Sequence, residues 1–289
     1  MDERDRPMTG RELTLDLPGQ RMRALEWGPA DGAPILAVHG WLDNAASFVG
    51  LAPMLDRYRV IALDLAGHGR SDHWPQHCSH YFVDWVPQVI GAADVLGCET
   101  FVLLGHSMGA GISSLVPSAA PGRVSRLVLL EGAGPLTTPP EDAPTLLRTA
   151  LEDERRVAAA SPRIHPDLES ALAARCHGTD LSPDAGRPIV ERSVEAVDGG
   201  VRFTFDPRLK SRSRWRFTEE QVLAFLAAID CPVLMVRADS GWPVPEDQME
   251  ARLATIPELT KIVVEGGHHV HLTNPERVAP AILEFLTAD

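Results

Sequence analysis

Three scarcities in this 289-residue chain each exclude a class of protein. Basic residues are outnumbered: 27 Lys and Arg face 40 Asp and Glu, which gives a formal net charge of −13 at pH 7. Nucleic acids and anionic membrane surfaces attract basic proteins, so we expect neither as a partner. Every apolar run is shorter than the ~20 residues that span a bilayer. The charged segment Met1–Pro7 lacks the apolar centre of a signal peptide, so we predict no secretion signal.

Cysteine is the third scarcity. The chain has only four, without the spacing of a metal site or a disulfide framework: Cys78, Cys98, Cys176 and Cys231. We interpret them as reduced, partly buried thiols and predict a cytoplasmic protein. An apolar content of 44% and a charged content of 23% are ordinary for a globular protein. The length allows one large domain or a core with a lid.

The strongest local signal is Gly-His-Ser-Met-Gly at residues 105–109. It follows the apolar run Phe101–Leu104, which is typical of a buried strand, and it overlaps a predicted helix over Met108–Ala120. A serine on a sharp strand-to-helix turn forms a nucleophile elbow, whose strained backbone requires small neighbours. Gly105 and Gly109 meet that requirement, so we predict a catalytic nucleophile at Ser107. The alternative is an ordinary serine in a tight turn.

Alternating strands and helices predict an α/β fold. Apolar or alternating runs indicate eight strands, over residues 12–17, 21–27, 34–38, 60–65, 101–104, 124–130, 232–236 and 261–264. Helical periodicity occurs between them, over 45–55, 81–96 with a kink at Pro87, 219–229, 246–256 and 275–286. This order predicts a mostly parallel eight-stranded sheet with helices on both faces.

The pattern changes between residues 134 and 217. Prolines cluster at positions 135, 139, 140 and 144, helical stretches occupy 145–160 and 168–176, and no buried strand is apparent. A short alternating stretch covers 201–205. We interpret 134–217 as an inserted helical lid between two parts of one core, residues 1–133 and 218–289.

Several segments together resemble the α/β-hydrolase family. They are the elbow, His39-Gly40-Trp41 as the oxyanion loop, Asp64–Ser71 as its D-x-x-G-x-G-x-S segment, and Gly267-His268 as its histidine loop. The resemblance covers the whole chain except its middle. Asp206–Leu209, Val263–His271 and the acidic residue Glu131 are similar to the serine hydrolase-like branch of the family.

The resemblance implies a base, and oxyanion donors, for Ser107. In this fold the histidine follows the last strand, which favours His268, with His269 and His271 as neighbouring competitors. A metal site at this histidine cluster is the alternative, but no Cys or carboxylate ligand set accompanies it. The oxyanion donors implied by the family are the backbone N–H groups of Trp41 and Met108.

The acid departs from the common family pattern. Many members carry it after the seventh strand, where this chain has Ala238-Asp239-Ser240-Gly241, with glycine at the usual aspartate position. Glu131 ends the sixth strand, where a subset of the family places its acid. A carboxylate ending a buried strand needs a partner, and His268 would supply one. We therefore favour Glu131 and keep Asp239 as the alternative.

These residues favour a serine hydrolase that cleaves carboxylic esters, thioesters or lactones through an acyl-enzyme on Ser107. A carbon–carbon bond hydrolase or a cofactor-free perhydrolase on the same triad is an alternative, as is a ligand-binding receptor with slow turnover. Serine at the elbow argues against the dehalogenases and epoxide hydrolases of this fold, which use aspartate. We expect a small-molecule substrate and neither a cofactor nor a metal. The acyl and alcohol specificity and the oligomeric state are left open.

Overall fold

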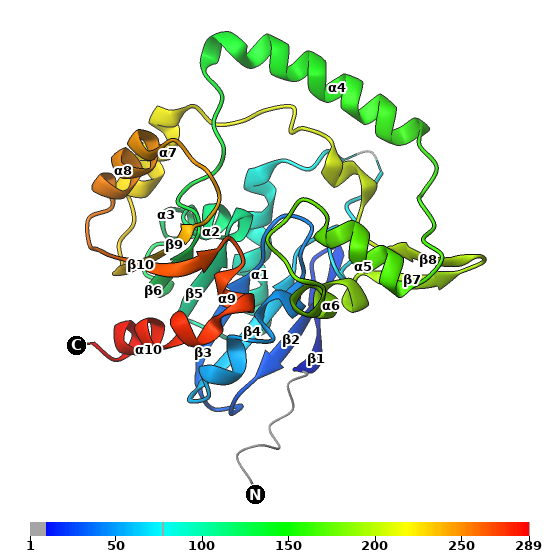
Figure 1. Ribbon diagram of the computed structural model, residues 1–289. Helices are drawn as coiled ribbons and strands as arrows, with labels where there is room; N and C mark the ends of the chain where they lie inside the picture. The colour runs from blue at the N-terminus through cyan, green and yellow to red at the C-terminus, as the bar shows by residue number, and fades with distance from the viewer. Residues whose placement is uncertain (1–9, 77, 289) are drawn as a thin grey trace, which may run out of the picture.

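A single eight-stranded sheet organises the computed structural model, which describes residues 10–76 and 78–288 (Figure 1). The prediction about a signal peptide at Met1–Pro7 therefore lies outside the described residues. The strands of the sheet are β1 (Arg11–Leu17), β2 (Gln20–Trp27), β3 (Ala33–Val38), β4 (Tyr58–Asp64), β5 (Phe101–His106), β6 (Val124–Leu130), β9 (Val233–Ser240) and β10 (Leu259–Gly267). All eight predicted strands are present, most of them longer by a few residues.

The sheet is mostly parallel, as the sequence predicts. Its strand order is β1-β2-β4-β3-β5-β6-β9-β10. Only β1 with β2 and β2 with β4 pair antiparallel, and the other neighbours pair parallel. Because β5, β6 and β10 point the same way, their carboxyl ends meet at one edge of the sheet.

Helices cover both faces, and alternate residues of each strand belong to two separate cores. One core packs against α1 (Val86–Val95), α3 (Val116–Ala119), α7 (Glu219–Ala227) and α8 (Glu246–Thr255). The other packs against the 3₁₀ helices η2 (Ala45–Phe48) and η3 (Ala52–Met54) and against α10 (Ala279–Thr287). Strand β3 shows the alternation, since Leu36 lies in the first core and Ile35 in the second.

Proline changes three of the predicted helices. The helix expected over 45–55 is two 3₁₀ turns, and the second begins around Pro53. Pro87 does not kink a long helix; it lies in the first turn of α1, where its missing N–H costs nothing. The elbow helix stops at Ser113 as α2 (Met108–Ser113), and α3 starts separately with Pro117 in its first turn.

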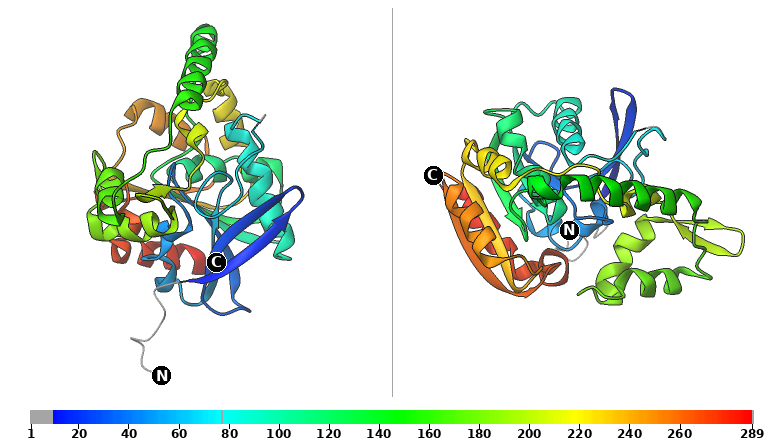
Figure 2. Two further views of the ribbon diagram at one scale, coloured as in Figure 1. Left: turned by 90° about the vertical axis from the view of Figure 1, so that its right-hand side faces the viewer. Right: turned by 90° about the horizontal axis from the view of Figure 1, so that it is seen from above.

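The insert, residues 134–217, is more varied than the sequence indicates. It contains α4 (Ala143–Ala159) and α5 (Leu168–Cys176), close to the predicted helices, and also α6 (Pro183–Arg192) and the hairpin β7 (Val194–Val197) with β8 (Gly200–Phe203). Both hairpin strands are at least partly exposed, so the expectation of no buried strand holds. Figures 1 and 2 show α4 raised above the rest of the molecule.

Buried ion pairs fasten the insert to the core. The guanidinium of Arg192 on α6 donates from Nε to both carboxylate oxygens of Asp64 at 3.0 Å, and from a terminal nitrogen to Glu12 at 2.6 Å. Arg208 donates to the Asp206 carboxylate and to the carbonyls of Trp74 and Cys78. The Asp206–Arg208 ion pair lies within the insert, and Arg208 reaches the core through hydrogen bonds to backbone carbonyls. No helix among the described residues is long and apolar enough to cross a membrane.

Candidate active site

Ser107 lies in a strained turn between β5 and α2. Its backbone angles are φ 53° and ψ −115°, outside the regions that L-residues ordinarily occupy. A Cβ at Gly105 would lie 2.4 Å from the Gly109 carbonyl oxygen, and a Cβ at Gly109 would lie 2.0 Å from the Val38 oxygen. The requirement for glycine on both sides of the serine is therefore steric, as predicted from the elbow motif.

His268 comes from the loop after β10 and faces Ser107. Its Nε2 lies 2.8 Å from the Ser107 Oγ, and its Nδ1 lies 3.2 Å from the Glu131 Oε2. A carboxylate only accepts hydrogen bonds, so Nδ1 carries the proton. Nε2 is then free to accept the proton of the Ser107 hydroxyl.

Glu131 begins the loop after β6 and turns its carboxylate toward the loop after β9. Its side chain is 5% exposed, and it accepts hydrogen bonds from the amides of Ala238 and Trp242 as well as from His268. A Cβ at Gly241 would lie 1.9 Å from the Glu131 Oε2. The carboxylate thus occupies the space that a side chain at the usual acid position would need.

The other candidates turn elsewhere. Asp239 is exposed, and its carboxylate accepts the Gly266 amide at 3.1 Å. The His269 ring contacts carboxylates of Asp180 and Asp43, and the His271 Nε2 lies 2.9 Å from the Ser47 hydroxyl. Among the residues that the structure describes, only His268 pairs with Ser107.

The peptide before Trp41 is held in a fixed orientation. Burial lowers the pKa of His39, so its ring is neutral. Its Nε2 accepts the Leu65 amide at 3.1 Å, so Nδ1 donates to the Gly40 carbonyl at 2.7 Å. In a trans peptide the Trp41 N–H points opposite to that carbonyl. Within residues 10–76 and 78–288, neither the Trp41 nor the Met108 amide bonds to a backbone carbonyl of another segment.

Backbone strain gathers at this site. In the described part of the chain, the non-glycine residues with positive φ are Leu42 at 59°, Ser107 at 53° and Glu131 at 60°. Leu42 follows Trp41, whereas Ser107 and Glu131 are the two residues that contact the His268 ring nitrogens. Each such conformation costs of order 1–3 kcal/mol and persists where the surrounding structure enforces it, which is common at active sites.

Comparison with known proteins fits this geometry. The sequence profile of the family described as alpha/beta hydrolase fold matches residues 33–275. The chain belongs to the α/β-hydrolase fold family. Within it, this α/β hydrolase is 32% identical to a serine hydrolase-like protein of Dictyostelium discoideum, over 96% of this chain and 82% of that protein. The similarity supports a serine hydrolase in general terms.

Two solved structures resemble this α/β hydrolase over nearly its full length. A hypothetical protein of Pseudomonas aeruginosa PAO1 superposes with a TM-score of 0.91 at 38% identity, covering 96% of this chain and 99% of the other. A thioesterase domain from the curacin biosynthetic pathway gives a TM-score of 0.83 at 27% identity, covering 95% and 99%. These likenesses agree with the eight-stranded fold.

Sequence reasoning missed a polar cluster beside His268. Burial alone would lower the pKa of His269, but the carboxylates of Asp180 and Asp43 on its two ring nitrogens raise it to about 9. Burial would raise the pKa of Asp43, but the bond from His269 and the charge of Arg175 hold it well below its ordinary value. The adjacent histidines at 268 and 269 were the only signal in the sequence.

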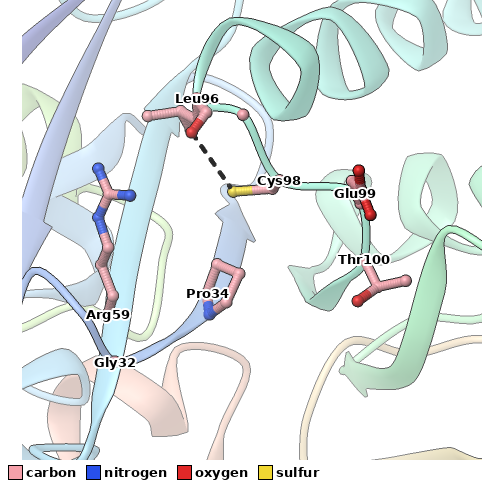
Figure 3. Close-up of a pocket in the computed structure, with 8 residues that line it drawn as sticks. Gly32, Pro34, Arg59, Leu96, Cys98, Glu99 and Thr100 are labelled. Atoms are coloured by element: carbon pink, nitrogen blue, oxygen red, sulfur yellow. Dashed lines mark hydrogen bonds between the residues drawn. The ribbon is translucent and has the colours of Figure 1, made fainter.

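A pocket of about 390 Å³ lies away from this site (Figure 3). It is lined by Pro34 and by Leu96–Thr100, near the amino ends of β3 and β5, whereas Ser107 follows the carboxyl end of β5. Its lining includes neither Ser107 nor His268, so this pocket is separate from the candidate active site. Among the described residues, no three His, Cys, Asp or Glu side chains are arranged to hold a metal ion.

Proposed function

We propose that this protein is a serine hydrolase that cleaves carboxylic esters, thioesters or lactones, with Ser107 as nucleophile, His268 as base and Glu131 as the acid that orients the base. The main support is a chain of two hydrogen bonds: Ser107 Oγ lies 2.8 Å from His268 Nε2, and His268 Nδ1 lies 3.2 Å from the Glu131 carboxylate. Such a hydrogen-bonded arrangement supplies an activated nucleophile at neutral pH.

The reaction proceeds in two halves. Ser107 Oγ attacks the carbonyl carbon of the substrate while its proton passes to His268 Nε2, and the N–H groups of Trp41 and Met108 stabilise the oxyanion. The carbon–oxygen or carbon–sulfur bond to the leaving group then breaks, and His268 protonates that group. A water molecule gives a proton to His268 and attacks the acyl carbon. The bond from that carbon to Ser107 Oγ then breaks, His268 returns the proton to Oγ, and the carboxylic acid is released.

Two exposed tryptophans favour substrates with an apolar part. Trp242 is 60% exposed, with its ring 5.5 Å from the His268 ring. Trp41 is 52% exposed, and its indole N–H donates to the Leu209 carbonyl of the insert at 3.0 Å. Exposed aromatic surface beside a catalytic centre offers apolar contact to an acyl chain or alcohol. The likeness to a thioesterase domain supports including thioesters.

Probe labelling tests the proposal. A fluorophosphonate, which forms a bond to an activated serine, should label the protein, and peptide mapping should place the adduct on Ser107. Ser107→Ala should abolish labelling, while Ser118→Ala, a matched change on neighbouring α3, should leave it unchanged. A label on another residue, or no label on the folded protein, would contradict the assignment of the nucleophile.

Turnover separates this proposal from its alternatives. p-Nitrophenyl acetate, p-nitrophenyl butyrate and an acyl thioester should be hydrolysed faster by the wild type than by Ser107→Ala. Labelling of Ser107 with ester and thioester rates at the buffer background would favour the slow-turnover receptor. Labelling with activity only toward carbon–carbon bonds, or only with peroxide as acceptor, would favour the other two alternatives.

A further inference from the structure

The peptide bond that follows His268 is held at both ends. Its carbonyl oxygen, on His268, lies 2.9 Å from the Nε2 of His106. A carbonyl only accepts, so Nε2 of His106 carries a proton and donates it. The N–H of the same peptide, on His269, donates to the Oδ2 of Asp180 at 2.7 Å. His106 directly precedes Ser107 in the chain, and Asp180 belongs to the insert.

Asp180 reaches this peptide from the turn after α5 and lies directly over Gly267. A Cβ built on Gly267 would lie 2.5 Å from the Asp180 Oδ2, and the three nearest atoms all belong to Asp180. Gly267 does not have a positive φ, so its backbone conformation does not itself require glycine. What requires glycine is space, because a side chain at position 267 would occupy the place of the Asp180 carboxylate. The close approach therefore depends on glycine immediately before His268.

A buried charge network fixes Asp180 in place. Its other oxygen accepts from the Nδ1 of His269 at 2.6 Å, and the opposite ring nitrogen lies 3.5 Å from the fully buried Asp43. Asp43 also pairs with Arg175 on α5. The insert therefore contributes one cation and one anion to the network, and breaking one bond leaves a buried charge without its partner.

We infer that Asp180 is a positioning residue for His268: from the insert, its carboxylate fixes the peptide after the catalytic histidine and so sets the distance from Nε2 to Ser107. The inference rests on the proposed function for its effect on rate. It makes the proton transfer depend on how the insert docks. A misplacement of about 1 Å costs on the order of 10²-fold in rate.

The first test measures kcat per titrated active site. Asp180→Ala should lower kcat by roughly 10- to 100-fold with KM within about twofold, because the lost contact orients a catalytic group and does not bind substrate. Asp180→Asn should recover most of the rate, since its amide oxygen still accepts the His269 N–H. Titration with the fluorophosphonate counts reactive serines, so unfolded protein does not enter the rate.

The matched control is Glu12→Gln. It also removes a carboxylate that pairs the insert with the core, through Arg192, but it touches no part of the histidine loop. Its kcat should stay within about twofold of wild type. An equal loss in Glu12→Gln and Asp180→Ala would overturn the inference, because general loosening of the insert would then explain both.

A double-mutant cycle tests the contact itself. Gly267→Ala should displace Asp180 and lower kcat to a similar degree, but in the Asp180→Ala background it should add little. Residues that act through one contact are non-additive in this way. Additive losses would show that Gly267 and Asp180 act independently and would contradict the inference.

Hydrogen–deuterium exchange gives a readout that needs no activity. The His269 amide should exchange faster in Asp180→Ala than in wild type or Glu12→Gln, because it loses its acceptor. Unchanged exchange overturns the inference whatever the activity. A wild type that neither labels nor hydrolyses esters overturns the proposed function instead, and faster exchange in Asp180→Ala would still support the held peptide.

Discussion

Glu131→Gln changes one atom of the proposed triad and leaves the shape of the side chain intact. Glu131 receives three N–H donors: Ala238 on Oε1, and Trp242 and His268 on Oε2. A glutamine has only one acceptor oxygen, so its NH₂ group must face at least one of these donors. Both orientations of the amide therefore damage the site, by different routes.

The two orientations predict the size of the effect. An NH₂ group at the Oε2 position would force His268 to accept on Nδ1, which places its proton on Nε2 and removes the base for Ser107. An NH₂ group at the Oε1 position would leave the Ala238 amide unsatisfied, at about 1–3 kcal/mol, and would still remove the charge that stabilises the imidazolium. The corresponding change in the serine-protease triad lowers kcat on the order of 10⁴-fold, or about 5 kcal/mol of transition-state stabilisation.

Steady-state kinetics on p-nitrophenyl butyrate measures this loss, with circular dichroism as the folding control. Asp239→Asn is the matched substitution, since Asp239 is an exposed carboxylate that bonds only to the Gly266 amide among the described residues. It should lower kcat by less than about tenfold. A large loss in Asp239→Asn beside near-normal activity in folded Glu131→Gln would refute the assignment of the acid.

Three further perturbations have defined outcomes. Gly241→Ala should lower kcat at least on the order of 10²-fold, because its methyl group would displace Glu131. Gly122→Ala strains its own turn, where φ is 75°, but its Cβ meets no atom within 4 Å, so kcat of the folded protein should be unchanged. His269→Gln should destabilise the protein by roughly 3 kcal/mol at pH 6, because the folded-state pKa of about 9 exceeds the ordinary 6.5; this difference should shrink as pH rises from 6.5 through 9 in urea titrations, and a pH-independent difference would contradict it. Dialysis against a strong chelator should leave ester hydrolysis unchanged, whereas loss of activity with recovery on adding zinc would overturn the role of His268 as base.

The predictable parts of this molecule are those encoded in neighbouring residues. The elbow, the eight strands and the glycine requirement at 105 and 109 follow from patterns within a dozen residues. The preference for Glu131 followed from the glycine at position 241, which the sequence displays directly. Helix boundaries were less predictable, because Pro87 and Pro117 are tolerated in the first turn of a helix as well as at its break.

Contacts between remote segments could not be predicted where neither residue belongs to a family motif. Asp180 and His269 are 89 positions apart, and the short segment that carries Asp180 has no motif that marks it. The partner of His106 is a backbone carbonyl, which every residue has, so its identity depends on the fold alone. Of the hairpin β7–β8, only the second strand was indicated, by the alternating stretch at 201–205; β7 has four residues and is not fully buried.

The overlap between Glu131 and position 241 also limits how such a site evolves. An aspartate at position 241 beside Glu131 would place its Cβ 1.9 Å from the Glu131 Oε2, which is a steric clash, and would bring a second negative charge close to the first. Loss of Glu131 first leaves the histidine without an acid. Under the proposed mechanism either substitution alone would lower kcat, although the two together would move the acid to the next strand. Under that mechanism, no single substitution at position 131 or 241 converts one acid position into the other.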